Sequence, residues 1–87
     1  MRKISLKITN PDGLTAPRAA DLVAEANKYQ SEVKLHCGDN FCDLKSIMDV
    51  FGTIFASTGD DLVITFEGID EVKAEDGFKK LLTIYHF

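Results

Sequence analysis

The stretch Asp61-Leu62-Val63-Ile64-Thr65-Phe66-Glu67, closed by Gly68, is the clearest strand in the sequence. Residues 3–8 add a strict period of two, with Ile4, Leu6 and Ile8 against polar partners, which predicts strands with one buried face and one solvent-facing face. Beyond Gly68, the apolar residues change to helical spacing, at Ala74, Phe78, Leu81, Leu82 and Tyr85. A final helix is therefore expected to cover the buried face, although Gly77 in its interior costs about 1 kcal/mol relative to alanine.

The same two patterns recur upstream and give the order of the elements. Strands are expected at residues 3–8, 32–37, 41–43 and 61–67. Helices are expected from Thr15 to about Tyr29, at about 46–54, and along the apolar stripe 74–85. Turn-forming residues separate them, as in Asn10-Pro11-Asp12-Gly13 and Gly38-Asp39-Asn40. The order β-α-β-β-α-β-α predicts an α+β fold, in which a four-stranded antiparallel sheet carries its helices on one face.

Length and charge limit the kind of protein. The 87 residues suffice for one domain, residues 1–87. A formal charge of −4 argues against the broad basic face that nucleic acids require, so we expect no direct nucleic-acid partner. The longest apolar runs are far below the roughly 20 residues that span a bilayer, so no membrane insertion is expected. Because the first residues, Met1-Arg2-Lys3, lack an apolar signal core, a cytoplasmic location is expected.

The two cysteines do not form a recognisable redox or metal motif. Cys37 and Cys42 are five positions apart, which matches neither a CxxC pair nor half of a zinc site. We therefore predict reduced cysteines that serve packing, with a cross-strand disulfide or redox switch as the alternative. No metal and no cofactor are expected.

Two segments carry a resemblance to a known family. They are Asn10-Pro11-Asp12-Gly13-Leu14-Thr15-Ala16-Pro17-Arg18-Ala19-Ala20 and Lys45-Ser46-Ile47-Met48. Together with the order of elements, they resemble the HPr family, the phosphocarrier proteins of the bacterial sugar phosphotransferase system. The resemblance spans essentially the whole chain and implies an HPr-like open-faced β-sandwich.

The first segment departs from the family at its active centre. The family motif reads Asn-Pro-x-Gly-Leu-His-Ala-Arg-Pro-Ala, and its histidine takes a phosphoryl group from enzyme I and passes it to sugar-specific transporter subunits. In this chain that histidine falls on Thr15, and the Arg-Pro pair is reversed as Pro17-Arg18. The reversal moves the guanidinium by one helical position, roughly 100° around the axis. The resemblance therefore implies an active loop of Thr15, Ala16 and Arg18 without its acceptor.

A threonine cannot replace the histidine as a fast relay. Imidazole is a neutral nucleophile with a pKa near 6.5, whereas an alcohol needs a base and forms a much less labile ester. Two interpretations of Thr15 are open: a helix N-cap whose side-chain oxygen binds a free amide, or part of an anion site beside Arg18. His36 and His86 are expected to be surface or edge residues, with a substitute acceptor role as the alternative.

Ser46 carries the second part of the resemblance. In HPr proteins of low-GC Gram-positive bacteria and in the catabolite-repression HPr-like protein, the corresponding serine is phosphorylated by the ATP-dependent HPr kinase. The modified protein then binds a LacI-type repressor. The resemblance implies that Ser46 is a candidate site of regulatory phosphorylation, and the alternative is a serine that only caps the short helix. Asp49 lies one turn further on the same face and is expected to repel a phosphoserine.

The short helix also carries an apolar group. Ile47, Met48 and Phe51 predict a partner-binding face, which is the docking face of this helix in the family, with burial under the following loop as the alternative. The leading hypothesis is a non-enzymatic HPr-like regulator that has lost carrier activity and binds HPr kinase, a LacI-type repressor or other phosphotransferase proteins. A phosphocarrier with a non-standard acceptor is the alternative.

The sequence bears on two further classes of function, a small catalytic domain and a diverged paralogue. A small catalytic domain is not supported, because the sequence has no paired carboxylates, no nucleophile and base at a plausible spacing, and no Gly-rich phosphate loop. A diverged paralogue with a different partner is the other possibility. Acidic residues in the C-terminal half would suit a basic partner, although such runs are usually a solvated face. They are Asp60, Asp61, Glu67, Asp70, Glu71, Glu75 and Asp76.

Overall fold

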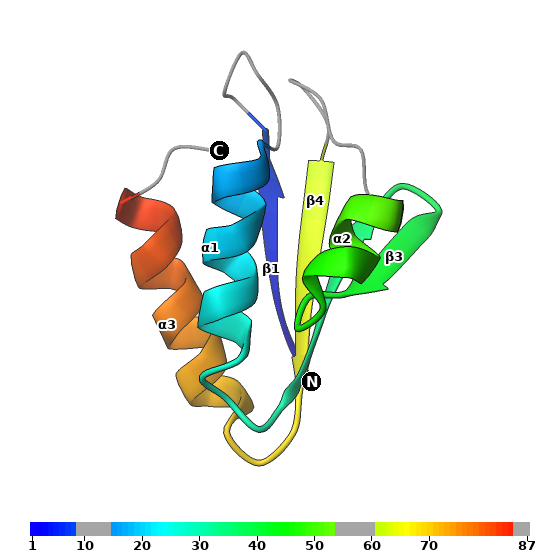
Figure 1. The fold of residues 1–87 in the computed structure, drawn as a ribbon. Coiled ribbons are helices and arrows are strands. Elements are labelled where there is room, and N and C mark those ends of the chain that lie inside the picture. The colour runs from blue at the N-terminus through cyan, green and yellow to red at the C-terminus, as the bar shows by residue number, and fades with distance from the viewer. Residues whose placement is uncertain (9–14, 54–60, 85–87) are drawn as a thin grey trace.

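The computed structural model describes residues 1–8, 15–53 and 61–84 and has the expected order of elements (Figure 1). In chain order these are β1 (Arg2–Lys7), α1 (Ala16–Ala26), β2 (Glu32–Cys37), β3 (Asn40–Asp43), α2 (Ile47–Thr53), β4 (Asp61–Glu67) and α3 (Glu71–Ile84). Within the described ranges, no helix combines the length and the apolar character needed to cross a membrane. The turn expected at residues 10–13, residue 54, Tyr85 and His86 lie outside the described residues.

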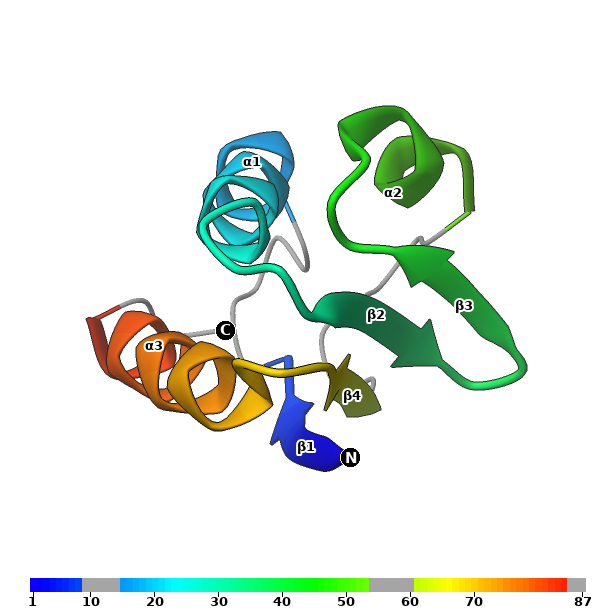
Figure 2. The ribbon, with the colours of Figure 1, turned by 90° about the horizontal axis from the view of Figure 1, so that it is seen from below.

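The four strands form one antiparallel sheet in the order β1-β4-β2-β3. All three helices lie on the same side of it, which Figure 2 shows along the strands, so the predicted one-sided arrangement is confirmed. The register places Ile64 of β4 opposite Ile4 of β1 and Leu35 of β2. Since alternate side chains of a strand share a face, this row faces the helices and the intervening residues face solvent.

The core lies between the sheet and the helices. From β4, the predicted inward residues Leu62, Ile64 and Phe66 are all buried. The Phe66 ring meets the Phe78 ring of α3 edge to face, with centroids 5.2 Å apart and an interplanar angle of 65°. This is a favourable aromatic geometry, and it anchors α3 on the central strand.

Several element boundaries differ from the sequence prediction by one to three residues. Helix α1 ends at Ala26 and not at Tyr29, because the backbone tightens there: Lys28 N donates to Glu25 O and Tyr29 N donates to Ala26 O, both three residues back. Such bonds close a last turn that is not α-helical. Strand β1 runs from residue 2 to 7 and not from 3 to 8, and the buried Ile8 follows it.

Gly77 lowers the stability of α3 as an isolated helix, but the packing of α3 against the Glu25–Tyr29 segment requires it. The hydroxyl of Tyr29, three residues after the end of α1, lies where a Cβ on Gly77 would stand, and Glu25 Oε2 of α1 lies 2.7 Å from that position. Tyr29 donates its hydroxyl proton to this same carboxylate oxygen at 2.7 Å. Only glycine therefore allows α3 to approach α1 here, a contact between distant residues that the local sequence could not reveal.

Candidate functional site

Thr15 occupies the N-cap position of α1, but its side chain makes no capping hydrogen bond. Its backbone is extended, with φ −80° and ψ 162°, and its carbonyl accepts the Ala19 amide at 2.9 Å. An N-cap side chain normally bonds the amide of the second or third helical residue. The second residue here is Pro17, which has no N–H and leaves only the Arg18 amide as a cap donor, and the predicted side-chain cap is not formed.

The Arg18 guanidinium lies along the first turns of α1. Its Nη1 is 3.9 Å from Asp21 Oδ2, which makes an i,i+3 ion pair. The two side chains are 34% and 40% exposed. Ala16 and Pro17 are exposed, and Thr15 is half-buried. The structure thus places Thr15, Ala16 and Arg18 together at the N-terminal end of α1, as the sequence predicted, with Asp21 as a neighbour of Arg18 that the sequence analysis did not use.

Ser46 caps α2, as predicted. Its Oγ accepts the Asp49 amide at 3.3 Å, and its carbonyl accepts the Val50 amide at 3.1 Å. The Ser46 amide in turn donates to Asp43 O at 3.1 Å. The hydroxyl that resemblance marks as a modification site is therefore engaged in the first turn of the helix.

Asp49 reaches back to strand β3. Its Oδ2 accepts the Asp43 amide at 2.7 Å, and Asp43 Oδ1 accepts the Lys45 amide at 2.9 Å. Two carboxylates thus border Ser46, where the sequence analysis named only Asp49. The sequence does contain a signal for the position of Asp43. An aspartate often accepts the amide two residues ahead in a turn, and Lys45 stands at that spacing.

The segment before Ser46 is also fixed to the C-terminal end of α1. Lys45 Nζ donates to Tyr29 O at 2.7 Å. Asn27 Nδ2 donates to both Val23 O and Lys45 O, at 2.9 Å and 3.1 Å. Because Asn27 and Tyr29 follow the end of α1 and Lys45 precedes α2, these bonds hold the start of α2 against α1.

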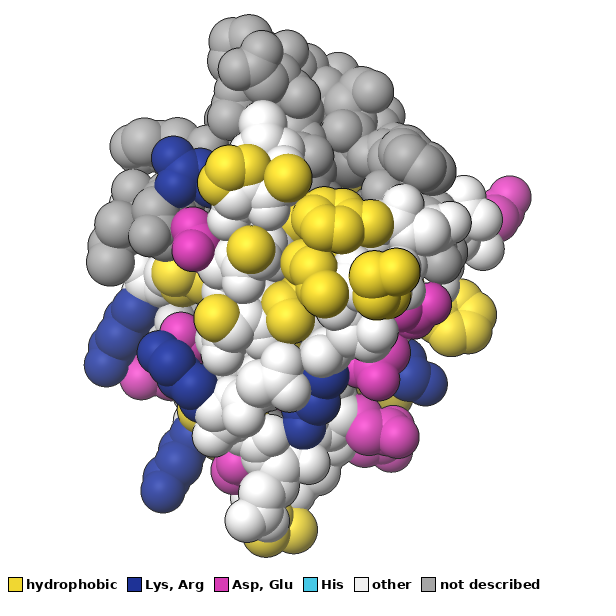
Figure 3. Space-filling model, viewed as in Figure 1, with side chains coloured by type: hydrophobic (Ala, Val, Ile, Leu, Met, Phe, Trp, Pro, Cys, Tyr) yellow, Lys and Arg dark blue, Asp and Glu magenta, His cyan; other side chains and the backbone are white. Residues whose placement is uncertain are grey.

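The apolar residues of α2 divide between core and surface. Val50 is buried and Ile47 is half-buried against the core, whereas 78% of Met48 and 44% of Phe51 are exposed. Figure 3 shows hydrophobic side chains gathered over α1 and α2 on this face of the molecule. Exposure of Met48 and Phe51 fits the predicted binding face; the following segment, 54–60, lies outside the described residues.

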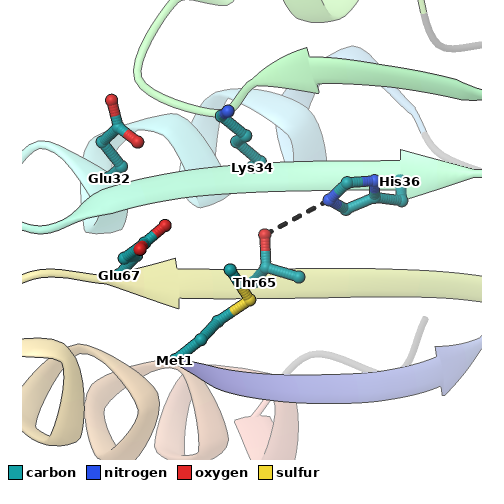
Figure 4. Close-up of a pocket in the computed structure, with 6 residues that line it drawn as sticks. All are labelled: Met1, Glu32, Lys34, His36, Thr65 and Glu67. Carbon is teal, nitrogen blue, oxygen red and sulfur yellow. Dashed lines mark hydrogen bonds between the residues drawn. The ribbon is translucent and has the colours of Figure 1, made fainter.

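His36 lies on the solvent-facing side of the sheet, opposite the helices (Figure 4). Its Nε2 is 3.2 Å from Thr65 Oγ1, and its ring stacks on Phe41 with centroids 5.8 Å apart. A small pocket of about 170 Å³ adjoins it. The residues that line the pocket are Met1, Glu32, Lys34, His36, Thr65 and Glu67. The sheet separates His36 from the start of α1, so the structure does not bring these two predicted positions together.

The cysteines are thiols, as predicted. Both lie on the helix-facing side of the sheet, because Cys42 is opposite the buried Leu35 and Cys37 is two residues after Leu35 on the same strand. Burial, with a smaller effect of the Asp49 charge, raises the pKa of Cys42 to about 11. A thiol with so high a pKa stays protonated and unreactive. Among the described residues, no three histidine, cysteine or carboxylate side chains form a group that could hold a metal ion.

Comparison with known proteins identifies relatives along nearly the whole chain. The family profile "PTS HPr component phosphorylation site" matches residues 2–83. The phosphocarrier protein HPr of Mycoplasma pneumoniae is 32% identical over 83 residues, which cover 94% of this chain and 93% of the relative.

Solved structures of HPr-like proteins also superimpose on nearly the whole chain. The histidine-containing phosphocarrier protein of Mycoplasma superimposes with a TM-score of 0.89 at 31% identity, covering 95% of this chain and 93% of the other. The catabolite repression protein Crh of Bacillus subtilis superimposes with a TM-score of 0.70 at 28% identity, covering 97% and 95%.

Proposed function

The chain belongs to the HPr family, and from this premise we propose that it is a regulatory or partner-binding member that is defective as a histidine phosphocarrier. The observation that carries the proposal is Thr15, which follows Gly13-Leu14 where the family motif has its phosphorylated histidine. The reversed pair Pro17-Arg18 supports it, because it displaces the cation beside that position. Thr15, Ala16 and Arg18 would then keep at most an anion-binding role.

The chemistry of the remaining residues supports loss of the relay. An alcohol accepts a phosphoryl group only with a base, and the ester that forms is poor at passing it on. His36 is on the opposite side of the sheet from α1, where a donor docked at α1 would not reach it. His86 lies outside the described residues.

The α2 surface is the proposed partner-binding face. We define it by Ile47, Met48 and Phe51, of which Met48 and Phe51 are exposed. Methionine adapts to differently shaped partners, and exposed apolar groups on a small protein often mark an interaction site. The partners proposed by resemblance are HPr kinase, a LacI-type repressor and other phosphotransferase proteins, with Ser46 as the site of regulatory phosphorylation.

One observation favours a second function, a phosphocarrier with a non-standard acceptor. The Thr15 hydroxyl makes no capping hydrogen bond, so capping does not compete for it as it does at Ser46. A threonine acceptor would yield an acid-stable ester, in contrast to the acid-labile phosphohistidine of the family.

Two parallel reactions test the proposal. The protein is incubated with enzyme I and phosphoenolpyruvate, and separately with HPr kinase and ATP, and any added phosphate is mapped by peptide mass spectrometry. Matched Thr15→Ala and Ser46→Ala variants assign the site. Phosphate at Ser46 alone is the expected result. Phosphate taken from enzyme I and lost in the Thr15→Ala variant would favour the second function, and acid-labile phosphate on a histidine would refute the proposal.

A further inference from the structure

A groove of about 570 Å³ lies between α1 and α3. Clefts that bind ligands commonly have volumes of this size. We call it the α1–α3 groove and define it by six of the residues that line it, which are Glu25, Lys28, Tyr29, Lys73, Gly77 and Lys80. These residues belong to the C-terminal end of α1 and to α3, whereas the surfaces of the proposed function lie at the start of α1 and on α2.

Gly77 and Tyr29 form the buried side of the groove. The Tyr29 hydroxyl stands where a Cβ of Gly77 would lie, and it donates to Glu25 Oε2 at 2.7 Å. Burial and this hydrogen bond raise the pKa of Tyr29 to about 12, so the phenol keeps its proton and continues to donate. The buried side is therefore already hydrogen-bonded within the protein, and a ligand would meet the exposed lysines of the groove.

Lysines outnumber carboxylates among the groove residues. Lys28 Nζ lies 3.0 Å from Glu25 Oε1, and Lys80 Nζ lies 3.4 Å from Asp76 Oδ2. Lys73 has no ion-pair partner among the residues that the structure describes. Three lysines thus face two carboxylates, which leaves the groove positive in a chain of formal charge −4. Because an ammonium group has three donors and each ion pair occupies few of them, the lysines can still bind an added anion.

The charges of the molecule are also separated in space. Figure 3 shows Lys and Arg side chains over α1 and α3, and a group of Asp and Glu side chains on the opposite side, beside α2. An acidic partner is therefore attracted to the α1–α3 side and repelled from the other. The charge distribution orients such a partner toward the groove.

The spacing of the lysines selects the kind of anion. Lys73 and Lys80 are seven residues apart on α3, so they share a helix face and are separated by about 10 Å along the axis. A single phosphate or carboxylate cannot span that distance. A nucleic acid would carry a denser negative charge past Asp76, which lies between the two lysines in the sequence, and toward a negatively charged protein. A polypeptide can instead place separate carboxylates at the separation of the lysines.

We propose that the α1–α3 groove docks an acidic helical segment of a partner protein, whose carboxylates pair with Lys28, Lys73 and Lys80. A helix laid into a groove is a common mode of peptide recognition, and carboxylates seven residues apart on such a helix match the spacing of Lys73 and Lys80. Leu81, half-buried in the same groove, supplies an apolar contact. The proposal uses none of the residues on which the proposed function rests, so the two can fail separately.

Two synthetic peptides test the inference on the full chain. The acidic peptide is a helix of about 15 residues in an alanine and glutamine background, with glutamates at the i, i+4 and i+7 positions of one face. The control peptide has glutamine at those positions. In titrations followed by ¹⁵N NMR, we expect the acidic peptide to shift the amide signals of Lys28, Lys73, Gly77 and Lys80, and the control peptide to leave them in place. Binding should weaken as salt is raised.

A matched pair of double variants separates the groove from overall charge. Lys73→Gln with Lys80→Gln should weaken binding of the acidic peptide by at least about fivefold, since it removes two exposed ion pairs with the peptide. Lys3→Gln with Lys7→Gln changes the net charge equally, but these exposed lysines lie on the solvent-facing side of the sheet, so binding should stay within about twofold of the parent. Lys73→Gln alone, which removes no ion pair among the described residues, should give a smaller loss in the same direction and covers the case in which the double variant does not fold.

Several results would overturn the inference. They are the absence of peptide-induced shifts, shifts centred away from the groove, and equal weakening in the two double variants. Tighter binding of a single-stranded oligothymidylate than of the acidic peptide would also overturn it, because the groove would then prefer a nucleic acid.

Discussion

The N-terminal ends of α1 and α2 both begin with a hydroxyl residue, yet their hydrogen bonding differs. At α1 the Thr15 side chain makes no cap bond, because Pro17 withholds one of the two amides that a cap uses. At α2 the Ser46 hydroxyl accepts the Asp49 amide, and Asp49 continues the connection to strand β3. The two ends therefore differ through residues of the first helical turn, Pro17 in α1 and Asp49 in α2.

The difference also separates the two functional surfaces. On the proposed function, the α1 end keeps the position of the family's phosphoryl acceptor but lacks its imidazole, because Thr15 stands there. The α2 end combines the cap bond of Ser46 with the exposed side chains of Met48 and Phe51. Under the proposed function, the protein no longer transfers a phosphoryl group at α1 and binds its partners through α2.

Restoring the family motif at α1 should have the largest effect. The triple variant Thr15→His, Pro17→Arg, Arg18→Pro supplies the imidazole, returns the cation to its family position and keeps a proline in the first helical turn. We expect acid-labile phosphate from enzyme I and phosphoenolpyruvate to rise from background by at least about 100-fold, since a suitable nucleophile and its positioning are each worth orders of magnitude. A triple variant that folds, as judged by circular dichroism, and remains at background would show that α1 lacks more than these residues.

Truncation of the α2 face should have the next largest effect. An exposed methionine at the centre of an interface typically contributes about 1–2 kcal/mol, so Met48→Ala is expected to weaken binding to HPr kinase by about 5- to 30-fold in titration calorimetry. Val72→Ala is the matched control, because Val72 is 60% exposed on α3, away from this face. Equal losses in the two variants would contradict a specific role for α2.

The two caps can be compared directly by stability. Ser46→Ala should lower the free energy of unfolding by about 1 kcal/mol, because it removes an existing cap bond. Thr15→Ala should change it by only a few tenths of a kcal/mol, since no such bond is lost. Urea unfolding of the two variants beside the parent measures both values. A Thr15→Ala loss equal to that of Ser46→Ala would mean that the threonine hydroxyl caps α1 after all.

The smallest effect is expected at the Arg18–Asp21 ion pair. Its atoms are 3.9 Å apart and its side chains are partly exposed, so Asp21→Asn should lower stability by less than about 0.5 kcal/mol. Asp49→Ala, which removes the 2.7 Å bond to the Asp43 amide, should cost more in the same urea assay. The reverse order would indicate that α1 is the more strongly fixed end.

Local periodicity was sufficient to predict the order of elements, because each strand and helix buries one face. The apolar composition of 61–67 identified the strand that lies between β1 and β2, and the stripe through Phe78 identified the helix that packs on it. The cap at Ser46 was also predictable, since serine before an apolar helix has a local partner. In each case the cause lies within a few residues of its effect.

Contacts between distant residues were beyond the reach of local patterns. No residue near Gly77 in the sequence indicates that the Tyr29 hydroxyl occupies the place where a Cβ would stand. Asp49 was expected to act on Ser46 alone, whereas its carboxylate binds the Asp43 amide of the neighbouring strand. The missing cap at Thr15 is a different case, because Pro17 is close in sequence and its lack of an amide is a local signal against a cap bond.

The central claim, loss of phosphocarrier activity at α1, is tested most directly by the stoichiometry of acid-labile phosphate after incubation with enzyme I and phosphoenolpyruvate. An ordinary histidine-containing HPr in the same reaction provides the positive control. Loss of carrier activity predicts no acid-labile phosphate on this chain while the control is fully labelled. A stoichiometry approaching one phosphate per chain would contradict it.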